Sequence, residues 1–253
     1  MYDTSWARTP PARLAREGIV CGVFDPLISF YCHRTVRGQE HLDGLDAPVL
    51  FVANHASHAD TPVLLRSLPP RWRRRTAVAA AADYFYSKQH LAVSVSLAFG
   101  TIPLERRGGG LDEDATAHLR RLLDDRWSLV VYAEGTRSRD GSVGKLRTGA
   151  AVLAATYGLP IVPVHTAGTH VAMPTGRRWM ERPSRLSRHP ISVTFGAPIR
   201  ATPQDDRFEV MEQVRVFLEQ QGARTTPDPK LARRRAARAG ADASEGAGGG
   251  EAA

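Results

Sequence analysis

The sequence contains little lysine and very little cysteine. Its only lysines are Lys88, Lys145 and Lys230, so the formal net charge of +8 comes almost entirely from arginine. A basic chain of this kind suits an anionic partner, which can be a phospholipid surface, a nucleic acid or an acidic carrier protein. The two cysteines, Cys21 and Cys32, provide neither a metal-binding spacing nor a disulfide framework. A reducing, cytoplasmic setting is therefore the default expectation.

Long hydrophobic runs are also missing. The first residues lack the apolar core and cleavage site of a signal peptide. The most apolar early stretch, residues 18–32, is interrupted by Asp25 and Pro26 and is too short and broken to span a bilayer. Residues 12–32 are expected to form a helix with one apolar face, which can either pack on the core or lie in a membrane interface.

Downstream of this segment, short apolar runs alternate with helical patterns. This alternation predicts an α/β fold, with one domain built on a central, largely parallel sheet flanked by helices. The expected strands lie at residues 48–53, 76–80, 100–104, 129–132, 161–164 and 191–195. The expected helices lie at residues 60–68, 83–98, 111–125, 148–157 and 204–220.

Three regions are expected along the chain. Residues 1–34 form the N-terminal helical segment, with a possible membrane-interfacial role, and residues 35–221 form the α/β domain. Residues 222–253 are rich in Arg, Ala, Gly and Pro and have no apolar periodicity. This composition is typical of a disordered tail.

The first chemical signal is a histidine and an aspartate five residues apart, directly after the apolar run of residues 48–53. His55 and Asp60 would not meet on an ideal helix, but they can meet at a strand-to-helix turn. The carboxylate would then accept a hydrogen bond from one ring nitrogen and leave the other free as a base. The alternative is that Asp60 caps the following helix and that His55 is structural.

Two further polar segments follow predicted strands. Arg106 lies beside three glycines, a combination that suits a phosphate, although an ordinary exposed turn has the same composition. The run Glu134, Gly135, Thr136 and Arg137 follows a buried strand and offers a carboxylate, a tight turn, a hydroxyl and a guanidinium together. Such a set can bind the hydroxyls and phosphate of a small polar headgroup.

Together these segments resemble the glycerolipid acyltransferase family typified by 1-acylglycerol-3-phosphate acyltransferase. That family has four ordered blocks: Asn-His-x-Ser-x-x-Asp, Gly-x-Ile-x-x-x-Arg, Glu-Gly-Thr-Arg-Ser, and a block similar to Pro-Ile-Val-Pro-Val. This chain matches them in order at residues 54–60, 100–106, 134–138 and 160–164. Two positions depart from the family pattern: Ala133 replaces a usual proline, and Arg147 stands where lysine is common.

The resemblance implies roles for seven residues. His55 is the expected general base and Asp60 its orienting partner, and the other five are expected to bind the acceptor's glycerol phosphate. These five are Arg106, Glu134, Gly135, Thr136 and Arg137. The implied reaction moves a fatty acyl group from acyl-CoA or acyl carrier protein to the free hydroxyl of a lysophospholipid, with 1-acylglycerol-3-phosphate as the expected acceptor.

The resemblance also implies a setting for the reaction. No cofactor is expected, and the acyl donor is a substrate. The protein is expected to act peripherally at the cytoplasmic face of an anionic membrane, without a nucleic acid partner. Arginines in the run of residues 71–75 and in the tail would help to hold it there.

Three alternatives remain open at this point. The same family includes enzymes with another lysolipid or alcohol as acceptor. A metal-dependent hydrolase is conceivable because His55, His58 and Asp60 are close in sequence and are potential ligands. A non-enzymatic basic module that binds membranes or nucleic acids would also account for the charge.

Overall fold

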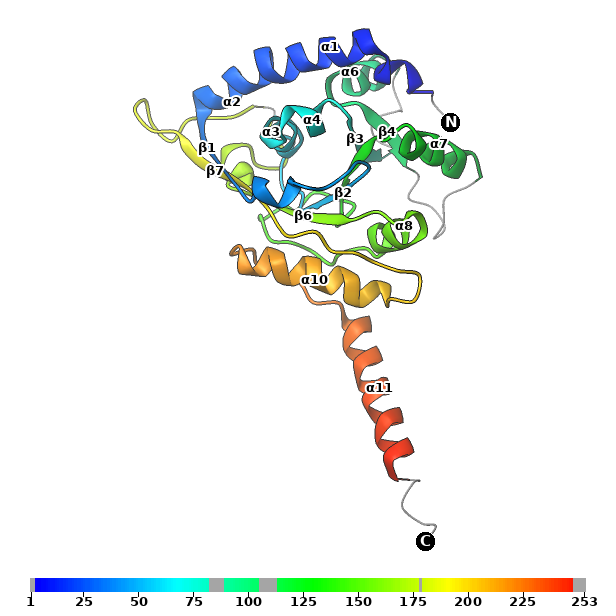
Figure 1. The fold of residues 1–253 in the computed structure, drawn as a ribbon. Coiled ribbons are helices and arrows are strands. Elements are labelled where there is room, and N and C mark those ends of the chain that lie inside the picture. Colours follow the sequence, from blue (N-terminus) through cyan, green and yellow to red (C-terminus); the bar gives the residue numbers. More distant parts are fainter. Residues whose placement is uncertain (1–2, 82–88, 105–112, 178, 248–253) are drawn as a thin grey trace.

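The computed structural model describes residues 3–81, 89–104, 113–177 and 179–247 (Figure 1). These residues form a seven-stranded sheet in the order β1-β7-β6-β2-β5-β3-β4. The central strands β6, β2, β5, β3 and β4 are mutually parallel, whereas β7 pairs antiparallel with β6 and parallel with β1. The predicted α/β fold with a largely parallel sheet is therefore confirmed.

The strand bounds agree closely with the sequence pattern, apart from one strand that it does not predict. The predicted strands are β2 (Leu50–Ala53), β3 (Thr76–Ala81), β4 (Thr101–Leu104), β5 (Ser128–Tyr132), β6 (Ile161–Ala167) and β7 (His189–Phe195). The additional strand is β1 (Cys32–Arg37), in which exposed residues alternate with buried or partly buried ones. It lies at the sheet edge, so it lacks the continuous apolar run that marks a strand buried on both faces.

Helices cover both faces of the sheet (Figure 1). The helices on one side are α1 (Pro10–Gly18), α2 (Asp25–Tyr31), α3 (Asp60–Ser67), α4 (Pro70–Arg73) and α6 (Gln89–Phe99). The remaining helices are α7 (Glu113–Asp124), α8 (Gly149–Tyr157), α9 (Thr169–Ala172), α10 (Arg207–Gln220) and α11 (Pro229–Ala247). Among the described residues, no helix combines the length and the apolar character that crossing a membrane would require.

Strand β2 shows how the core is divided. All four of its side chains are buried, because helices cover both faces of the sheet. Leu50 and Val52 join one apolar cluster with α7, α8 and α10, whereas Phe51 and Ala53 join the opposite cluster with α2 and α3. This alternation follows from the two-residue repeat of a strand. Because β2 is the fourth of the seven strands in the sheet, His55 follows a central strand.

The N-terminal segment is helical, as predicted, and runs through α1, a π-helical turn at Ile19–Phe24, and α2. Its inner face packs on the domain through the buried residues Val20 and Ile28. Its arginine Arg16 is also buried, and its guanidinium donates to the backbone carbonyls of Ala7, Ser96 and Leu97. Burial lowers the pKa of Arg16 to about 10. This face of the helix is therefore part of the protein interior.

The structure differs from the sequence prediction at the C-terminal tail. The chain from residue 222 first pairs with the core, where Val143 exchanges backbone hydrogen bonds with Arg224 and Thr226. It then forms α11, which projects from the body of the protein beyond α10 (Figure 1). Only Leu231 of this helix is buried among its described side chains. Alanine and arginine favour helix intrinsically, so α11 forms without the apolar periodicity on which the disorder prediction depended.

Candidate active site

His55 and Asp60 meet at the turn between β2 and α3. The His55 Nδ1 and Asp60 Oδ2 atoms are 2.9 Å apart. Because a carboxylate can only accept, Nδ1 carries the hydrogen and Nε2 is left as a base. The Asp60 side chain is fully buried, whereas that of His55 is 18% exposed. The predicted contact is present. The N-cap residue of α3 is Ala59, which makes no side-chain capping bond, so Asp60 is not the cap of this helix.

The same Asp60 oxygen holds the backbone of the turn. It accepts hydrogen bonds from the backbone N–H groups of Ala56 and Ser57, at 2.7 and 2.8 Å. Asn54 anchors the start of the turn, because its side-chain amide both donates to and accepts from the backbone of Thr166 in β6. The imidazole is therefore oriented by a carboxylate that is itself held by its surroundings.

An aromatic residue from the neighbouring strand completes the environment of His55. The ring of Tyr132 stacks on the imidazole with centroids 3.9 Å apart and planes inclined by 17°. Its hydroxyl lies 2.8 Å from Thr61 Oγ1, one residue beyond Asp60. Burial raises the pKa of Tyr132, and the nearby Asp60 raises it further. Tyr132 is not among the predicted site residues; its place at the end of the predicted strand, shortly before Glu134, was the signal available.

Glu134 has a different position from the one expected of a substrate ligand. Its Oε1 accepts from the backbone N–H of His55 at 2.8 Å, and its Oε2 accepts from the backbone N–H of Gly144 at 2.9 Å. The residue is only 8% exposed, and burial raises the pKa of its carboxyl group. The carboxylate thus connects the turn that carries His55 to the loop that follows β5.

Gly135 supplies the turn after Glu134. Its φ is +71°, and a Cβ there would lie 2.7 Å from Nε of Arg147. Any other residue would be strained at this φ and would also push against Arg147. The role of Gly135 that follows from the structure is therefore to allow this turn.

The other three expected substrate ligands are Thr136, Arg137 and Arg106. Thr136 is exposed and Arg137 is partly exposed at the start of the same loop. Arg137 lies close enough to His58 to influence its ionisation: partial burial lowers the pKa of His58 to about 4, with Arg137 and His55 as further causes. Arg106 lies outside the described residues.

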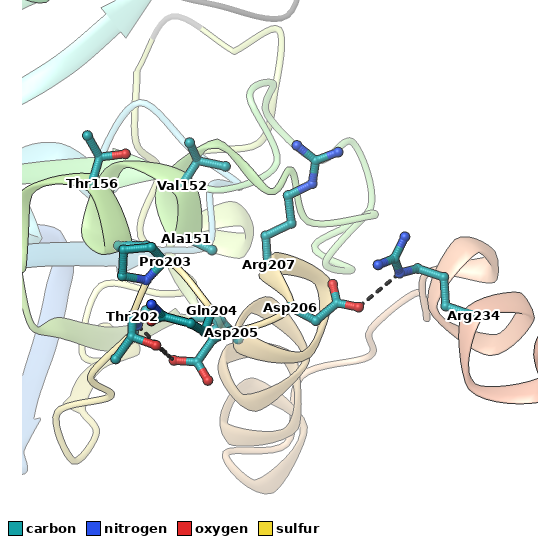
Figure 2. A pocket seen from close by; sticks show the side chains of 13 residues that line it. Ala151, Val152, Thr156, Thr202, Pro203, Gln204, Asp205, Asp206, Arg207 and Arg234 are labelled. Atoms are coloured by element: carbon teal, nitrogen blue, oxygen red, sulfur yellow. Dashed lines mark hydrogen bonds and ion pairs between the residues drawn. The ribbon is translucent and has the colours of Figure 1, made fainter. Parts of the chain in front are cut away.

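A separate open pocket lies between α8, the N-terminus of α10 and α11 (Figure 2). Its volume is about 480 Å³, and none of its lining residues belongs to residues 54–60 or 134–137. Its arginines Arg207 and Arg234 are matched by Asp205 and Asp206, and Arg234 donates to Asp206 at 2.9 Å. The balanced charges give this pocket no preference for an anion.

The described residues form an α/β protein with a histidine-carboxylate pair, His55 and Asp60, at the end of the central strand β2. The family model named Acyltransferase matches residues 33–167, and the chain belongs to this family. Among curated proteins, it is 32% identical to a chloroplastic 1-acyl-sn-glycerol-3-phosphate acyltransferase of Brassica napus, over 67% of this chain and 46% of that protein. A chloroplastic 1-acyl-sn-glycerol-3-phosphate acyltransferase of Arabidopsis thaliana is 30% identical over 67% of this chain and 44% of that protein. The chain thus spans slightly less than half the length of these relatives.

A solved structure has the same fold. It is the crystal structure of the 1-acyl-sn-glycerophosphate (LPA) acyltransferase PlsC from Thermotoga maritima. The two chains superpose with a TM-score of 0.60 over 88% of this chain and 85% of that chain, at 23% sequence identity. This likeness extends beyond the matched family segment to most of the described domain.

Proposed function

We propose that this protein transfers a fatty acyl group from acyl-CoA or acyl carrier protein to the free hydroxyl of a lysophospholipid, with 1-acylglycerol-3-phosphate as the acceptor. The observation that carries the proposal is the His55–Asp60 pair at 2.9 Å, held by the backbone of its own turn. Family membership and the names of the related acyltransferases support the reaction class.

The pair can carry out the reaction without an acyl-enzyme. His55 Nε2 takes the proton of the acceptor hydroxyl as that oxygen attacks the thioester carbonyl. Asp60 stabilises the imidazolium that forms. The tetrahedral intermediate then expels the thiolate, which receives the proton from His55. General-base assistance of this kind contributes about 10²–10⁴-fold, and positioning of the two substrates supplies further acceleration.

Neither cysteine has a role in this mechanism. Cys32 is buried in β1, and burial raises the pKa of its thiol to about 11. A thiol with so high a pKa is a poor nucleophile at neutral pH. Cys21 lies on the N-terminal helical segment, in contact with Glu17 of the same segment. The acceptor hydroxyl is therefore the nucleophile in the proposed reaction.

The proposed phosphate ligands are Arg106 and Arg137, because guanidinium presents paired donors to a phosphate. Thr136 is proposed to contact the glycerol backbone from its exposed position beside Arg137. The backbone hydrogen bonds of Glu134 and the positive φ of Gly135 support a different use for these two residues, which is to shape and hold the loop. We therefore propose that they act through His55 and the loop rather than as direct ligands.

The reaction is proposed to take place at the cytoplasmic face of an anionic membrane, with the protein bound peripherally. The lipid acceptor and the net charge of +8 support this setting. The outer face of the N-terminal helical segment adds exposed apolar side chains, among them Leu14, Val23 and Phe30.

The test is an acyl-transfer assay with the purified full chain. Radiolabelled acyl-CoA and acyl carrier protein donors are each combined with 1-acylglycerol-3-phosphate, other lysophospholipids and simple alcohols, and the products are separated by chromatography. We expect phosphatidic acid as the main product. Preference for an unphosphorylated acceptor would show that the protein has a different acceptor within the same acyltransferase family. No transfer with any pair, by a folded protein, would refute the proposal.

A further inference from the structure

The segment between α9 and β7, residues 173–188, is rich in arginine and carries exposed apolar side chains. It has five arginines and a single carboxylate, that of Glu181. Trp179 is 56% exposed and Leu186 is 97% exposed. Nothing in the proposed reaction uses these side chains. A tryptophan, an exposed leucine and several arginines in one segment form a combination typical of membrane-water interfaces.

This segment lies against the outer end of α2. The Trp179 indole N–H donates to the Tyr31 hydroxyl at 3.0 Å, and Arg188 donates to the Ser29 carbonyl at 2.9 Å. The guanidinium of Arg182 lies 5.1 Å from the ring centroid of Phe30. Figure 1 shows the segment as a protruding loop beside α2 and β1. Because Phe30 is itself 57% exposed, apolar surface of α2 continues that of the loop.

The first residues of the same segment contact the candidate active site. Ser57 Oγ, in the turn that carries His55, donates to the Met173 carbonyl at 2.8 Å. Thr175 Oγ1 donates to the Ser138 carbonyl at 2.9 Å, in the loop that follows Glu134. One continuous segment therefore connects an exposed basic and aromatic surface to both loops of the candidate active site.

The basic runs that the sequence favoured as membrane contacts are largely occupied within the protein. Arg73 is buried and bonds to Glu17, and Arg71 donates to the Leu42 carbonyl. In α11, Arg234 and Arg235 pair with Asp206 and Glu209. These intramolecular bonds compete with a lipid phosphate for the same guanidinium groups. Among the described arginines of residues 173–188, only Arg177 pairs with a carboxylate, that of Glu181. Arg182 and Arg188 each donate to a backbone carbonyl through one nitrogen, so their other N–H groups can still bind a lipid phosphate.

We propose that residues 173–188, together with the exposed end of α2, form the surface that docks the protein on an anionic lipid bilayer. Trp179 and Leu186 enter the interfacial region, and Arg182, Arg185 and Arg188 bind lipid phosphates. Charge complementarity and the exposed apolar side chains favour a bilayer over an acidic protein, which would not need an inserted leucine. The inference rests on the proposed function only in that the acceptor is a lipid.

The test measures vesicle binding of the full chain, without acyl donor or acceptor. Sucrose-loaded vesicles of phosphatidylcholine, alone or mixed with phosphatidylglycerol, are sedimented with wild type and with the triple variant Arg182→Gln, Arg185→Gln, Arg188→Gln. We expect wild type to bind the anionic vesicles, and the variant to bind them at least about tenfold more weakly. Thermal unfolding checks that the variant is folded.

A matched control removes the same charge elsewhere. The variant Arg233→Gln, Arg234→Gln, Arg235→Gln changes three arginines of α11 and should bind vesicles nearly as wild type does. For the apolar part, Leu186→Ser should weaken binding, whereas Val216→Ser should not, because Val216 is an exposed residue of α10 away from the segment. Leu186 makes the cleaner test because a side chain so exposed contributes little to folding.

Insertion itself is read from tryptophan fluorescence. Lipids brominated on their acyl chains should quench part of the emission of wild type. Trp179→Phe should remove most of that quenching, because Trp72 and Trp127 are buried and Trp6, the fourth tryptophan, is less exposed than Trp179.

Three results would overturn the proposal. Wild type could fail to bind anionic vesicles, or both triple arginine variants could lose binding equally. The third result is arginine-dependent binding to an acidic carrier protein without any binding to vesicles. The vesicle assay contains no acyl donor or acceptor. The docking proposal and the acyl-transfer proposal are therefore tested independently, and either one can fail without the other.

Discussion

Tyr132 stacks on His55 with ring centroids 3.9 Å apart, and its hydroxyl reaches Thr61 beside Asp60. The aromatic ring therefore restricts rotation of the imidazole from one face, while Asp60 restricts it from Nδ1. An aromatic face also stabilises a cation, so we expect this contact to favour the imidazolium of the proposed proton transfer. We therefore expect Tyr132 to be a positioning residue that acts through His55.

Replacement of Tyr132 separates these two effects. Tyr132→Leu should lower kcat about tenfold, as expected for a lost aromatic contact of roughly 1–2 kcal/mol, with little change in the KM of the acceptor. Tyr132→Phe keeps the stacked ring and loses only the bond to Thr61, so it should restore most of kcat. Equal kcat values for wild type and the leucine variant would show that the ring only fills space.

Removal of the base tests the reaction mechanism. His55→Ala should lower kcat by about 10²–10⁴-fold, because general-base assistance is lost. Asp60→Asn should also be severe, since a neutral amide cannot stabilise the imidazolium. Cys21→Ser and Cys32→Ser are the controls, and both should transfer normally. Near-normal turnover by His55→Ala, measured with labelled thioester, would refute the mechanism, and loss in the cysteine variants would indicate a covalent route.

Glu134→Gln tests whether this residue positions His55 or binds substrate. One of its two backbone N–H partners would face an amide NH₂ instead of an oxygen, which costs about 1–3 kcal/mol of folding stability. We expect a lower melting temperature and a lower kcat, with the acceptor KM nearly unchanged. An unchanged melting temperature with a higher acceptor KM would restore the role of substrate ligand.

Arg137→Ala should give the opposite pattern. Loss of a guanidinium from a phosphate typically removes about 1.5–3 kcal/mol of binding, so the acceptor KM should rise roughly tenfold or more. Donor KM should change little, because the acyl thioester is not proposed to contact this residue. Arg137→Lys keeps the charge but loses the paired donors, so it should fall between the two. If the alanine variant binds the phosphorylated acceptor as well as wild type does, the assignment of 1-acylglycerol-3-phosphate should be dropped.

His58 should make the protein sensitive to acid. Its pKa is lowered from 6.5 to about 4 in the folded state, so the unfolded state binds more protons between these two values. The free energy of unfolding should therefore decrease as pH falls through this window. His58→Gln removes the group and should flatten this part of the curve relative to wild type. Denaturant unfolding at a series of pH values measures the effect, and parallel curves for the two proteins would contradict it.

Much of the site could be predicted because it is local in sequence. His55 and Asp60 are five residues apart in one turn, and the run of residues 48–53 marks the buried strand that presents them. Buried strands of a parallel sheet are continuous apolar runs, so β2, β5 and β6 were visible without a structure. The order of the four blocks then indicated the family.

Other features depended on the tertiary structure. Glu134 accepts from a backbone group 79 residues away, and no local pattern shows whether a carboxylate faces substrate or a neighbouring loop. Likewise, only the packed helices show that Arg73 is bound by Glu17 and is therefore not a free basic group at the surface. The sequence determined which strands are buried and which residues can carry the chemistry, because strand periodicity and a five-residue turn are local properties. Folding determined which side chains are occupied within the protein and which remain free to bind a partner, because hydrogen bonds between distant segments depend on how the sheet and helices pack.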